Sequence, residues 1–427
     1  MLLLSAERRE AKATYDEYAG NGVSMKKEQH YLPRFYLRQF AVDAKRRNVS
    51  LFNVNRMLLV EEASIKHQAS EPFMYGEDGE MEEALMLLET ETARVLRRMI
   101  QYGRAPRQYS LDHQALAAFV VAQRRRTPRA ARELIESVNL PLAIAFRDDS
   151  RYAGVGREVL IAPENPPAAA VGWSLWLWPL LLDLRCKLLW TSLVPGFITS
   201  DNPAVYYNQL LESRRRHFSN TGLQTRGLQV FLPVSPQAVL MLYDGNAYRA
   251  GSCFRNAVHV ARRQDVVELN KLQAAAADVN LYFSTGIVAS HLHALLDQAR
   301  SAREAYHVQA REYRNPNNST EGLIHVRAPE IRLKLELSFV RPRPGADRDV
   351  DYTSVIAPRD RRTWDLTREF AERTLDGRAS QEDLFYFLAA NGKMRRTRSS
   401  YLGHRDAARG RPSAAKGGSS DWHRETD

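Results

Sequence analysis

The clearest pattern of apolar and polar positions in the chain predicts an amphipathic helix over residues 80–102. Its apolar positions recur every three or four residues, as one face of a helix requires. Arg97 and Arg98 in the expected last turn, followed by Gly103, are typical of a helix end. The residues that this pattern places on the buried face are Leu85, Leu88, Thr92, Val95, Leu96 and Met99.

Further helices are predicted on both sides of this one. Pro33 suits the first turn of a short helix, because the N–H that proline lacks has no partner there. Ser110 is placed to cap a longer helix, and Pro128 after Thr127 should kink or restart it. The expected helices cover residues 6–19, 33–41, about 110–147 with this restart, 264–278, and one or two stretches within 363–391.

Short runs rich in β-branched and aromatic residues predict strands, most of them in the second half of the chain. Residues 50–55 and 57–63 should form a hairpin; the other expected strands cover residues 187–193, 197–199, 204–207, 229–234, 238–243 and 280–284. They do not alternate with helices as βαβ units do. The predicted fold class is therefore α+β: a helical N-terminal half followed by a mostly antiparallel sheet, with a C-terminal extension and a disordered basic tail.

Composition divides the chain into four predicted parts. The composition shifts near Ser301, and residues 315–320 have the Asn, Pro and Ser content of a linker. Residues 331–337 alternate between apolar and charged side chains, which is the period of a half-buried strand. The predicted parts are a helical extension over residues 1–25, a core domain over 26–300, an appended α/β segment over 301–391, and a disordered basic tail over 392–427, where apolar residues are scarce.

The charge of the chain favours an anionic partner such as nucleic acid or a nucleotide. The formal net charge is +11 and the pI is about 9.6. However, residues 393–427 hold nine Lys or Arg and only four Asp or Glu, so the tail carries +5 of this charge. The rest of the chain has a mild positive excess, which weakens the prediction for the folded part.

Cysteine content and hydropathy predict a cytoplasmic protein without a membrane partner. Only Cys186 and Cys253 are present, which excludes a disulfide scaffold and suits a reducing compartment. The apolar run over residues 173–190 is interrupted by a proline and three charged residues, and charge is costly inside a bilayer. We expect a buried helix followed by a strand in this stretch. The oligomeric state stays open.

Four short blocks stand out: HYLPRFYLRQF at 30–40, QRRRTP at 123–128, FITSDNP at 197–203 and FLPVSP at 231–236. In this order and spacing they resemble an uncharacterised, mainly bacterial family known as domain of unknown function 4238, over roughly residues 28–286. The family has no established reaction, so the resemblance assigns no catalytic role to any residue. It does direct attention to the polar residues inside the blocks.

The first block combines a titratable imidazole with two arginines. His30 lies just before the helix start, where it is either a packed or capping histidine or a proton-transfer group. Arg34 and Arg38 are one turn apart and share a helix face, as a phosphate clamp requires.

Glu89 is unusual because it falls inside the apolar stripe of the 80–102 helix. A carboxylate buried there needs a partner, for which Arg38, Arg126 and His30 are candidates, or it takes up a proton. The alternative is an edge position from which Glu89 reaches water. In a dry site, Glu89 would act as a general base or a metal ligand.

The second and third blocks supply the remaining candidates. Gln123 and Arg126 are three residues apart and either hold an anionic group together or belong to a solvated charge run with one structural ion pair. Ser200, Asp201 and Asn202 follow a predicted strand, where they either form an Asx-turn or ligate a divalent cation.

These candidates support two hypotheses of function, and whether the protein is an enzyme stays uncertain. The first is a metal-assisted, nuclease-like hydrolase of a phosphate-containing substrate, with Mg²⁺ or Mn²⁺ as the cofactor. The alternative is a non-catalytic module that binds an anion or nucleic acid. A third interpretation is that the blocks only pack and cap. In the hydrolase, His30, Glu89 and Asp201 would be catalytic, Glu89 and Asp201 would hold the metal, and Arg34, Arg38, Gln123, Arg126, Ser200 and Asn202 would bind the substrate.

Overall fold

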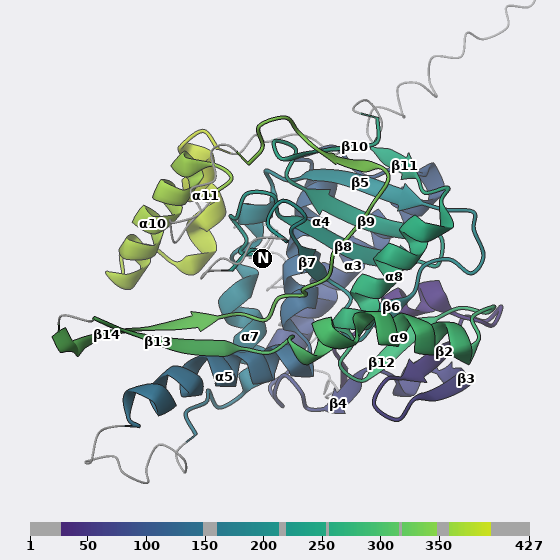
Figure 1. Ribbon diagram of the computed structural model, residues 1–427, viewed down its shortest axis with the longest axis horizontal. Helices are drawn as coiled ribbons and strands as arrows, with labels where there is room; N and C mark the ends of the chain where they lie inside the picture. The colour runs from purple at the N-terminus through teal and green to yellow at the C-terminus, as the bar shows by residue number, and fades with distance from the viewer. Residues whose placement is uncertain are drawn as a thin grey trace, which may run out of the picture.

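The computed structural model describes residues 27–147, 160–212, 219–252, 256–315, 318–347 and 358–393 (Figure 1). The predicted extension over residues 1–25, the helix expected at 6–19 and nearly all of the tail lie outside the described residues. Within them, no helix is both long and apolar enough to cross a membrane.

A five-stranded sheet forms the centre of the molecule. Its strands are β5 (Arg185–Trp190), β7 (Val205–Tyr207), β8 (Gln229–Ser235), β9 (Ala238–Tyr243) and β11 (Ala257–His259), in the order β11-β5-β9-β8-β7. Neighbouring strands are antiparallel except β11 and β5, which are parallel. Every residue of β8 and β9 is buried, so this part of the sheet is covered on both faces.

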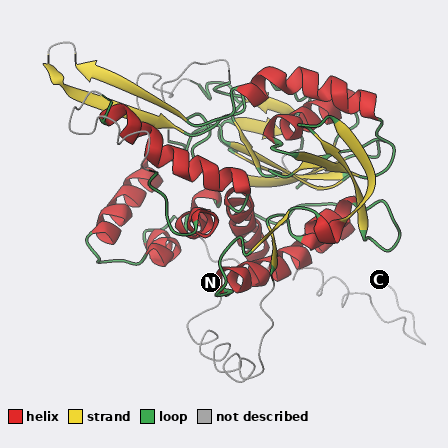
Figure 2. Cartoon of the chain, turned by 90° about the horizontal axis from the view of Figure 1, so that it is seen from below, coloured by secondary structure: helices red, strands yellow, loops and turns green. Residues whose placement is uncertain are grey.

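The two faces of the sheet belong to two different cores, because successive side chains of a strand point to opposite sides. Val230 and Leu232 of β8 pack in a core that includes α4. Phe231 of β8 and Met241 of β9 pack in the other core, with α8 and α9. Figure 2 shows the strands lying between helices on either side. The helices involved are α4 (Leu111–Arg125), α8 (Arg263–Ala276) and α9 (Ala289–Glu304).

A second sheet joins the beginning of the chain to its second half. It is antiparallel, in the order β3-β2-β12-β6, and consists of β2 (Asn48–Asn53), β3 (Leu58–Ser64), β6 (Thr199–Ser200) and β12 (Asn280–Phe283). The predicted hairpin and the strand at 280–284 are both found. Strands of the N-terminal half thus pair with strands of the second half, and the expected order of a helical half followed by a sheet is not confirmed. The α+β class is.

The long helix is found where the sequence predicts it. α3 spans Glu80–Tyr102, and its buried residues are the six of the predicted stripe. Ser110 caps α4 by accepting a hydrogen bond from the His113 N–H at 3.2 Å. Thr127 caps α5 (Pro128–Ala145) in the same way, through the Ala130 N–H at 3.3 Å. The predicted restart at Pro128 is therefore confirmed.

The first block forms a shorter helix than expected. Residues 34–37 are α2 (Arg34–Leu37), and the chain then tightens into the 3₁₀ turn η1 (Arg38–Phe40). β1 (Glu28–His30) precedes it and pairs with β4 (Ser70–Pro72), which follows the 3₁₀ turn η2 (Ile65–His67). Later in the chain, α7 (Pro166–Leu175) and the 3₁₀ turn η4 (Trp178–Leu181) precede β5. The strand expected within 173–190 is found, but the helix lies earlier than expected and only Ala170 and Val171 of it are buried.

The C-terminal segment packs on the rest of the molecule. β13 (Gln309–Asn315) and β14 (Asn318–Arg327) form a hairpin, so the linker expected at 315–320 is wrong. Residues 331–337 form no strand, although Ile331, Leu335 and Leu337 are buried in alternation with exposed charges. β15 (Val340–Pro342) pairs with β10 (Tyr248–Ala250). The remaining elements are α10 (Arg361–Leu375), the 3₁₀ turn η5 (Gln381–Asp383) and α11 (Leu384–Ala390).

The domain boundary near Ser301 stays a prediction. α9 continues through this position to Glu304, and β15 beyond it pairs with β10 before it.

Candidate functional site

The second block holds the backbone of the first. Gln123 Nε2 donates to the carbonyl oxygen of Tyr31 at 2.9 Å, and Arg126 Nη2 donates to that of His30 at 2.6 Å. Gln123 and Arg126 do share a face, as their spacing predicts. The two side chains bind the consecutive backbone carbonyl groups of His30 and Tyr31, shortly before the start of α2.

Tyr36 connects the first block to the other two. Its hydroxyl donates to the Pro233 carbonyl at 2.5 Å and lies 2.7 Å from Thr199 Oγ1. The side chain is fully buried, and this burial raises the pKa of its phenol. The four blocks are therefore joined by hydrogen bonds inside the protein. We call this set, formed by His30, Tyr31, Tyr36, Glu89, Gln123, Arg126, Thr199 and Pro233, the signature brace.

Glu89 is paired with Arg126, one of its three predicted partners. Arg126 Nη1 lies 2.8 Å from Glu89 Oε1; the Arg126 side chain is 2% exposed and that of Glu89 is 25% exposed. Burial alone would lower the pKa of Arg126, but the neighbouring Tyr75 and Glu89 raise it, so the guanidinium is charged. Tyr75 also donates its hydroxyl proton to the Arg126 carbonyl at 2.7 Å.

His30 is a partly buried ring beside this ion pair. Its Nδ1 lies 3.1 Å from the Gln68 carbonyl, so Nδ1 carries the proton. Burial lowers the pKa of His30, with further lowering from Arg34 and Arg126, and the imidazole is neutral at pH 7. Arg34 and Arg38 are exposed on the outer side of α2 and η1.

Asp201 binds a distant stretch of backbone instead of its own turn. Its carboxylate accepts hydrogen bonds from the N–H groups of Asp278, Val279 and Asn280, at 2.8, 2.6 and 3.0 Å. Burial raises the pKa of Asp201, and these three hydrogen bonds act against that rise. Ser200 donates to Gln273 Oε1 at 2.9 Å. The side chains of this turn thus fix the loop that leads into β12.

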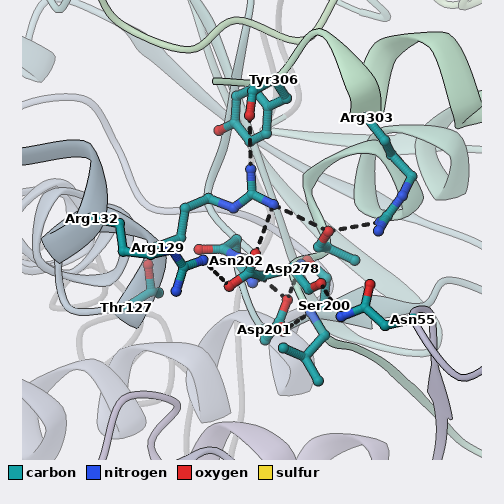
Figure 3. A network of polar contacts seen from close by, with 12 residues as sticks. Asn55, Thr127, Arg129, Arg132, Ser200, Asp201, Asn202, Asp278, Arg303 and Tyr306 are labelled. Carbon is teal, nitrogen blue, oxygen red and sulfur yellow. Dashed lines mark hydrogen bonds and ion pairs between the residues drawn. The ribbon is translucent and has the colours of Figure 1, made fainter. Parts of the chain in front are cut away.

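Three arginines gather around the next carboxylate. Arg129 Nη2 lies 3.1 Å from Asp278 Oδ1, and Arg132 pairs with Asp278 Oδ2 (Figure 3). Arg303 Nη1 donates to the carbonyls of Ala274 and Ala277 at 2.9 and 2.7 Å. Burial, followed by the charge of Arg129, lowers the pKa of Arg303. We call Arg129, Arg132, Arg303 and Asp278 the Asp278 arginine cluster.

Two buried polar atoms in this region have no hydrogen-bond partner among the described residues. One is Arg129 Nε and the other is Asn202 Oδ1. Arg129 is otherwise well held, since its Nη1 donates to the Tyr306 carbonyl at 3.2 Å and its guanidinium lies 4.7 Å from the Tyr306 ring centre. Asn202 Nδ2 donates to Asp201 Oδ1 at 3.3 Å. Buried polar groups without partners are rare and call for an explanation.

Seven of the nine predicted site residues fall into two groups, and the exposed Arg34 and Arg38 belong to neither. His30, Glu89, Gln123 and Arg126 belong to the signature brace, while Ser200, Asp201 and Asn202 adjoin the Asp278 arginine cluster. Tyr31 of the signature brace senses the second group, because burial raises its pKa and the charge of Asp201 raises it further. Within the described part of the chain, no three His, Cys, Asp or Glu side chains gather as a metal site.

Sequence reasoning missed Arg129, Arg132, Asp278 and Arg303. Arg129 and Arg132 are three residues apart just after the second block, which was a signal that they share a face of α5. Asp278 and Arg303 carry no such signal.

The comparisons with known proteins identify a family and no function. The family model described as "Protein of unknown function (DUF4238)" matches residues 28–286 of the 427, so the chain belongs to this family. No curated protein and no solved structure matches it.

Proposed function

We propose that this member of the family is a binding protein for a nucleotide or a similar small phosphorylated molecule, and that the ligand occupies the Asp278 arginine cluster. The observation that carries the proposal is the excess of positive charge. Arg129 and Arg132 share the single carboxylate of Asp278, and Arg303 contacts peptide carbonyls only among the described residues. A phosphate group would supply the missing negative charge and accept bidentate hydrogen bonds.

The outer part of the cluster is accessible to a ligand. The Arg132 side chain is 54% exposed and that of Asp278 20%, while Arg129 is 15% exposed behind them. Arg129 is held by Tyr306 and Asp278, so its guanidinium is fixed in place before any ligand arrives. Such preorganisation lowers the entropic cost of binding.

Asn202 indicates that the ligand also carries a hydrogen-bond donor. Its buried Oδ1 lacks a donor among the described residues, and a hydroxyl or amino group of the ligand would satisfy it. A phosphate next to a sugar hydroxyl, as in a nucleotide, carries both groups. Ser200 supports this role indirectly, because its Oγ accepts a hydrogen bond from the Asn202 N–H at 3.3 Å.

The metal-assisted hydrolase receives weaker support. Glu89 is committed to Arg126, and both carboxylate oxygens of Asp201 are committed to backbone N–H groups. A metal would have to displace these partners. Charged side chains that already complete the protein's own hydrogen bonds favour the binding function over the catalytic one.

Calorimetric titration of a nucleoside monophosphate tests the proposal. Arg132→Ala removes a half-exposed phosphate partner and should weaken binding roughly tenfold or more. The matched control is Arg97→Ala, which removes an exposed arginine from α3. Equal affinity in wild type and Arg132→Ala would reject the site.

An assay of the same protein with Mg²⁺ or Mn²⁺ against RNA, DNA and the nucleotide tests the alternative. We expect no cleavage. Cleavage that Asp201→Asn and Glu89→Gln both abolish would establish the hydrolase instead.

A further inference from the structure

A second cationic site lies in a cavity of about 530 Å³ beside the five-stranded sheet. Its lining includes Arg185 of β5, Tyr243 of β9, Arg249 of β10, and Arg343 just after β15. The volume lies in the range usual for small-molecule sites. None of its lining residues belongs to the Asp278 arginine cluster, and Figure 1 shows β5 and β10 near the top of the view and α5 near the bottom.

We propose that this cavity binds a small polyanion of the diphosphate type, held by Arg185, Arg249 and Arg343. The site is independent of the function proposed above, since it shares no residue with the cluster.

Two like charges face each other across β10 and β15. Arg249 of β10 stands directly opposite Arg341 of β15 in the antiparallel pair, and both are exposed. Like charges opposite each other destabilise a strand pair. Among the described residues, no carboxylate forms an ion pair with Arg249, Arg341 or Arg343. A bound anion would offset the repulsion that the described residues leave in place.

Gly245 supports two of the lining arginines, Arg185 and Arg343. Arg185 packs so closely on Gly245 that a Cβ there would lie 2.3 Å from Arg185 Nε. Arg343 Nε donates to the Gly245 carbonyl at 2.8 Å. Gly245 therefore contacts two arginines, Arg185 of β5 and Arg343 just after β15. Burial raises the pKa of the Tyr243 hydroxyl, while the charges of Arg185 and Arg343 both act to lower it.

A buried lysine supports the wall of the cavity. Lys187 is 3% exposed, and its Nζ donates to the carbonyl of Ser252, a lining residue, at 2.6 Å. This hydrogen bond fixes the backbone of one lining residue.

The extension of the chain completes the site. Arg341 and Arg343 lie outside residues 28–286, whereas Arg185 and Arg249 lie inside them. The cavity is therefore built jointly by the family core and a segment beyond it, and its ligand belongs to the full chain.

Titration of inorganic pyrophosphate into the full chain tests the proposal. Arg249→Ala should weaken binding roughly tenfold or more, because a charged hydrogen-bonding partner is lost. Arg249→Lys keeps the charge but cannot bind in a bidentate manner, and should weaken binding less. Arg97→Ala should leave pyrophosphate binding unchanged, and Arg249→Ala should leave nucleotide binding at the Asp278 arginine cluster unchanged.

The melting temperature, measured with and without pyrophosphate, distinguishes a ligand site from a purely structural role. Arg341→Gln should raise the melting temperature of the free protein by about 1–2 °C, because the repulsion is relieved. The same variant should gain less from saturating pyrophosphate than wild type does. Unchanged pyrophosphate affinity in both Arg249 variants would overturn the proposal. So would a wild type that binds a single-stranded oligonucleotide through Arg249 but not pyrophosphate.

Discussion

Arg126 and Arg129 are three residues apart, yet they belong to regions with opposite character. Arg126 of the signature brace is 2% exposed and contacts Glu89, the His30 carbonyl and Tyr75. Arg129 of the Asp278 arginine cluster is 15% exposed, shares its carboxylate with Arg132, and leaves Nε without a partner among the described residues. One arginine completes the protein's own hydrogen bonds, and the other has capacity left for a ligand.

This difference separates stability from binding. A buried charge whose partners all belong to the protein stabilises the fold only as a complete set, because the removal of one member leaves the others unpaired. A surplus charge near the surface contributes little to stability. It can instead contribute to affinity, where the ligand brings the missing partner. The following predictions test this separation.

The largest expected effect is on Arg126. Arg126→Ala should lower the free energy of unfolding by about 3–5 kcal/mol, since it breaks a buried pair and frees the His30 carbonyl. Urea unfolding measures this. The neighbouring Arg125 side chain is 38% exposed and lies 3.8 Å from Glu133, so Arg125→Ala should cost less than about 1 kcal/mol. If both variants lost the same free energy of unfolding, Arg126 would be no more important for stability than an exposed arginine.

Asp201 should also act through stability. Asp201→Asn keeps the shape but turns one acceptor of backbone N–H groups into a donor, and should cost about 2 kcal/mol. Asn202→Ala removes an acceptor that has no partner among the described residues, and should cost less than about 1 kcal/mol while weakening nucleotide binding. Urea unfolding and calorimetric titration of both variants separate the two roles. A free energy of unfolding as high in Asp201→Asn as in wild type would contradict the structural role of Asp201.

Arg132 should show the reverse behaviour. Its side chain is 54% exposed, so Arg132→Ala should change the free energy of unfolding by less than about 1 kcal/mol. Nucleotide affinity should nevertheless fall, as proposed above. A large loss of stability in this variant would place Arg132 with the structural arginines.

The smallest expected effect is a pH dependence of the brace. Burial lowers the pKa of His30, so the folded protein binds fewer protons there than the unfolded chain as pH falls below about 6.5. The contribution of His30 to stability should be present above that pH and decrease as pH falls toward the lowered pKa. Unfolding of wild type and His30→Gln at pH 7.5 and 5.5 measures the difference. An identical pH slope in both proteins would show that His30 does not titrate as described.

The sequence predicted the local features of these regions, such as helix faces and caps, better than the distant residues that their side chains contact. The buried face of α3 follows from its period, and the caps at Ser110 and Thr127 follow from residue type. Glu89 was recognised as needing a partner because it interrupts that face. In contrast, Asp201 binds N–H groups 77–79 residues away, and no local pattern records such a contact.

The Asp278 arginine cluster was missed for the same reason. Its members come from α5, from the segment between α8 and β12, and from the end of α9, which only the folded chain brings together. Arg34 and Arg38 illustrate the converse. Their spacing predicted a shared face, but spacing alone does not say whether that face meets a partner, and both lie exposed on the outside of α2 and η1.

The most direct test of the account is the nucleotide-induced rise in the urea unfolding midpoint, measured for wild type, Glu89→Gln and Arg132→Ala. A ligand at 100 times its Kd should stabilise wild type by about 2.7 kcal/mol. We predict that Glu89→Gln lowers the midpoint of the free protein but keeps this rise, and that Arg132→Ala keeps the midpoint but loses most of the rise. A full rise in Arg132→Ala, or its disappearance in Glu89→Gln, would contradict the separation of the two regions.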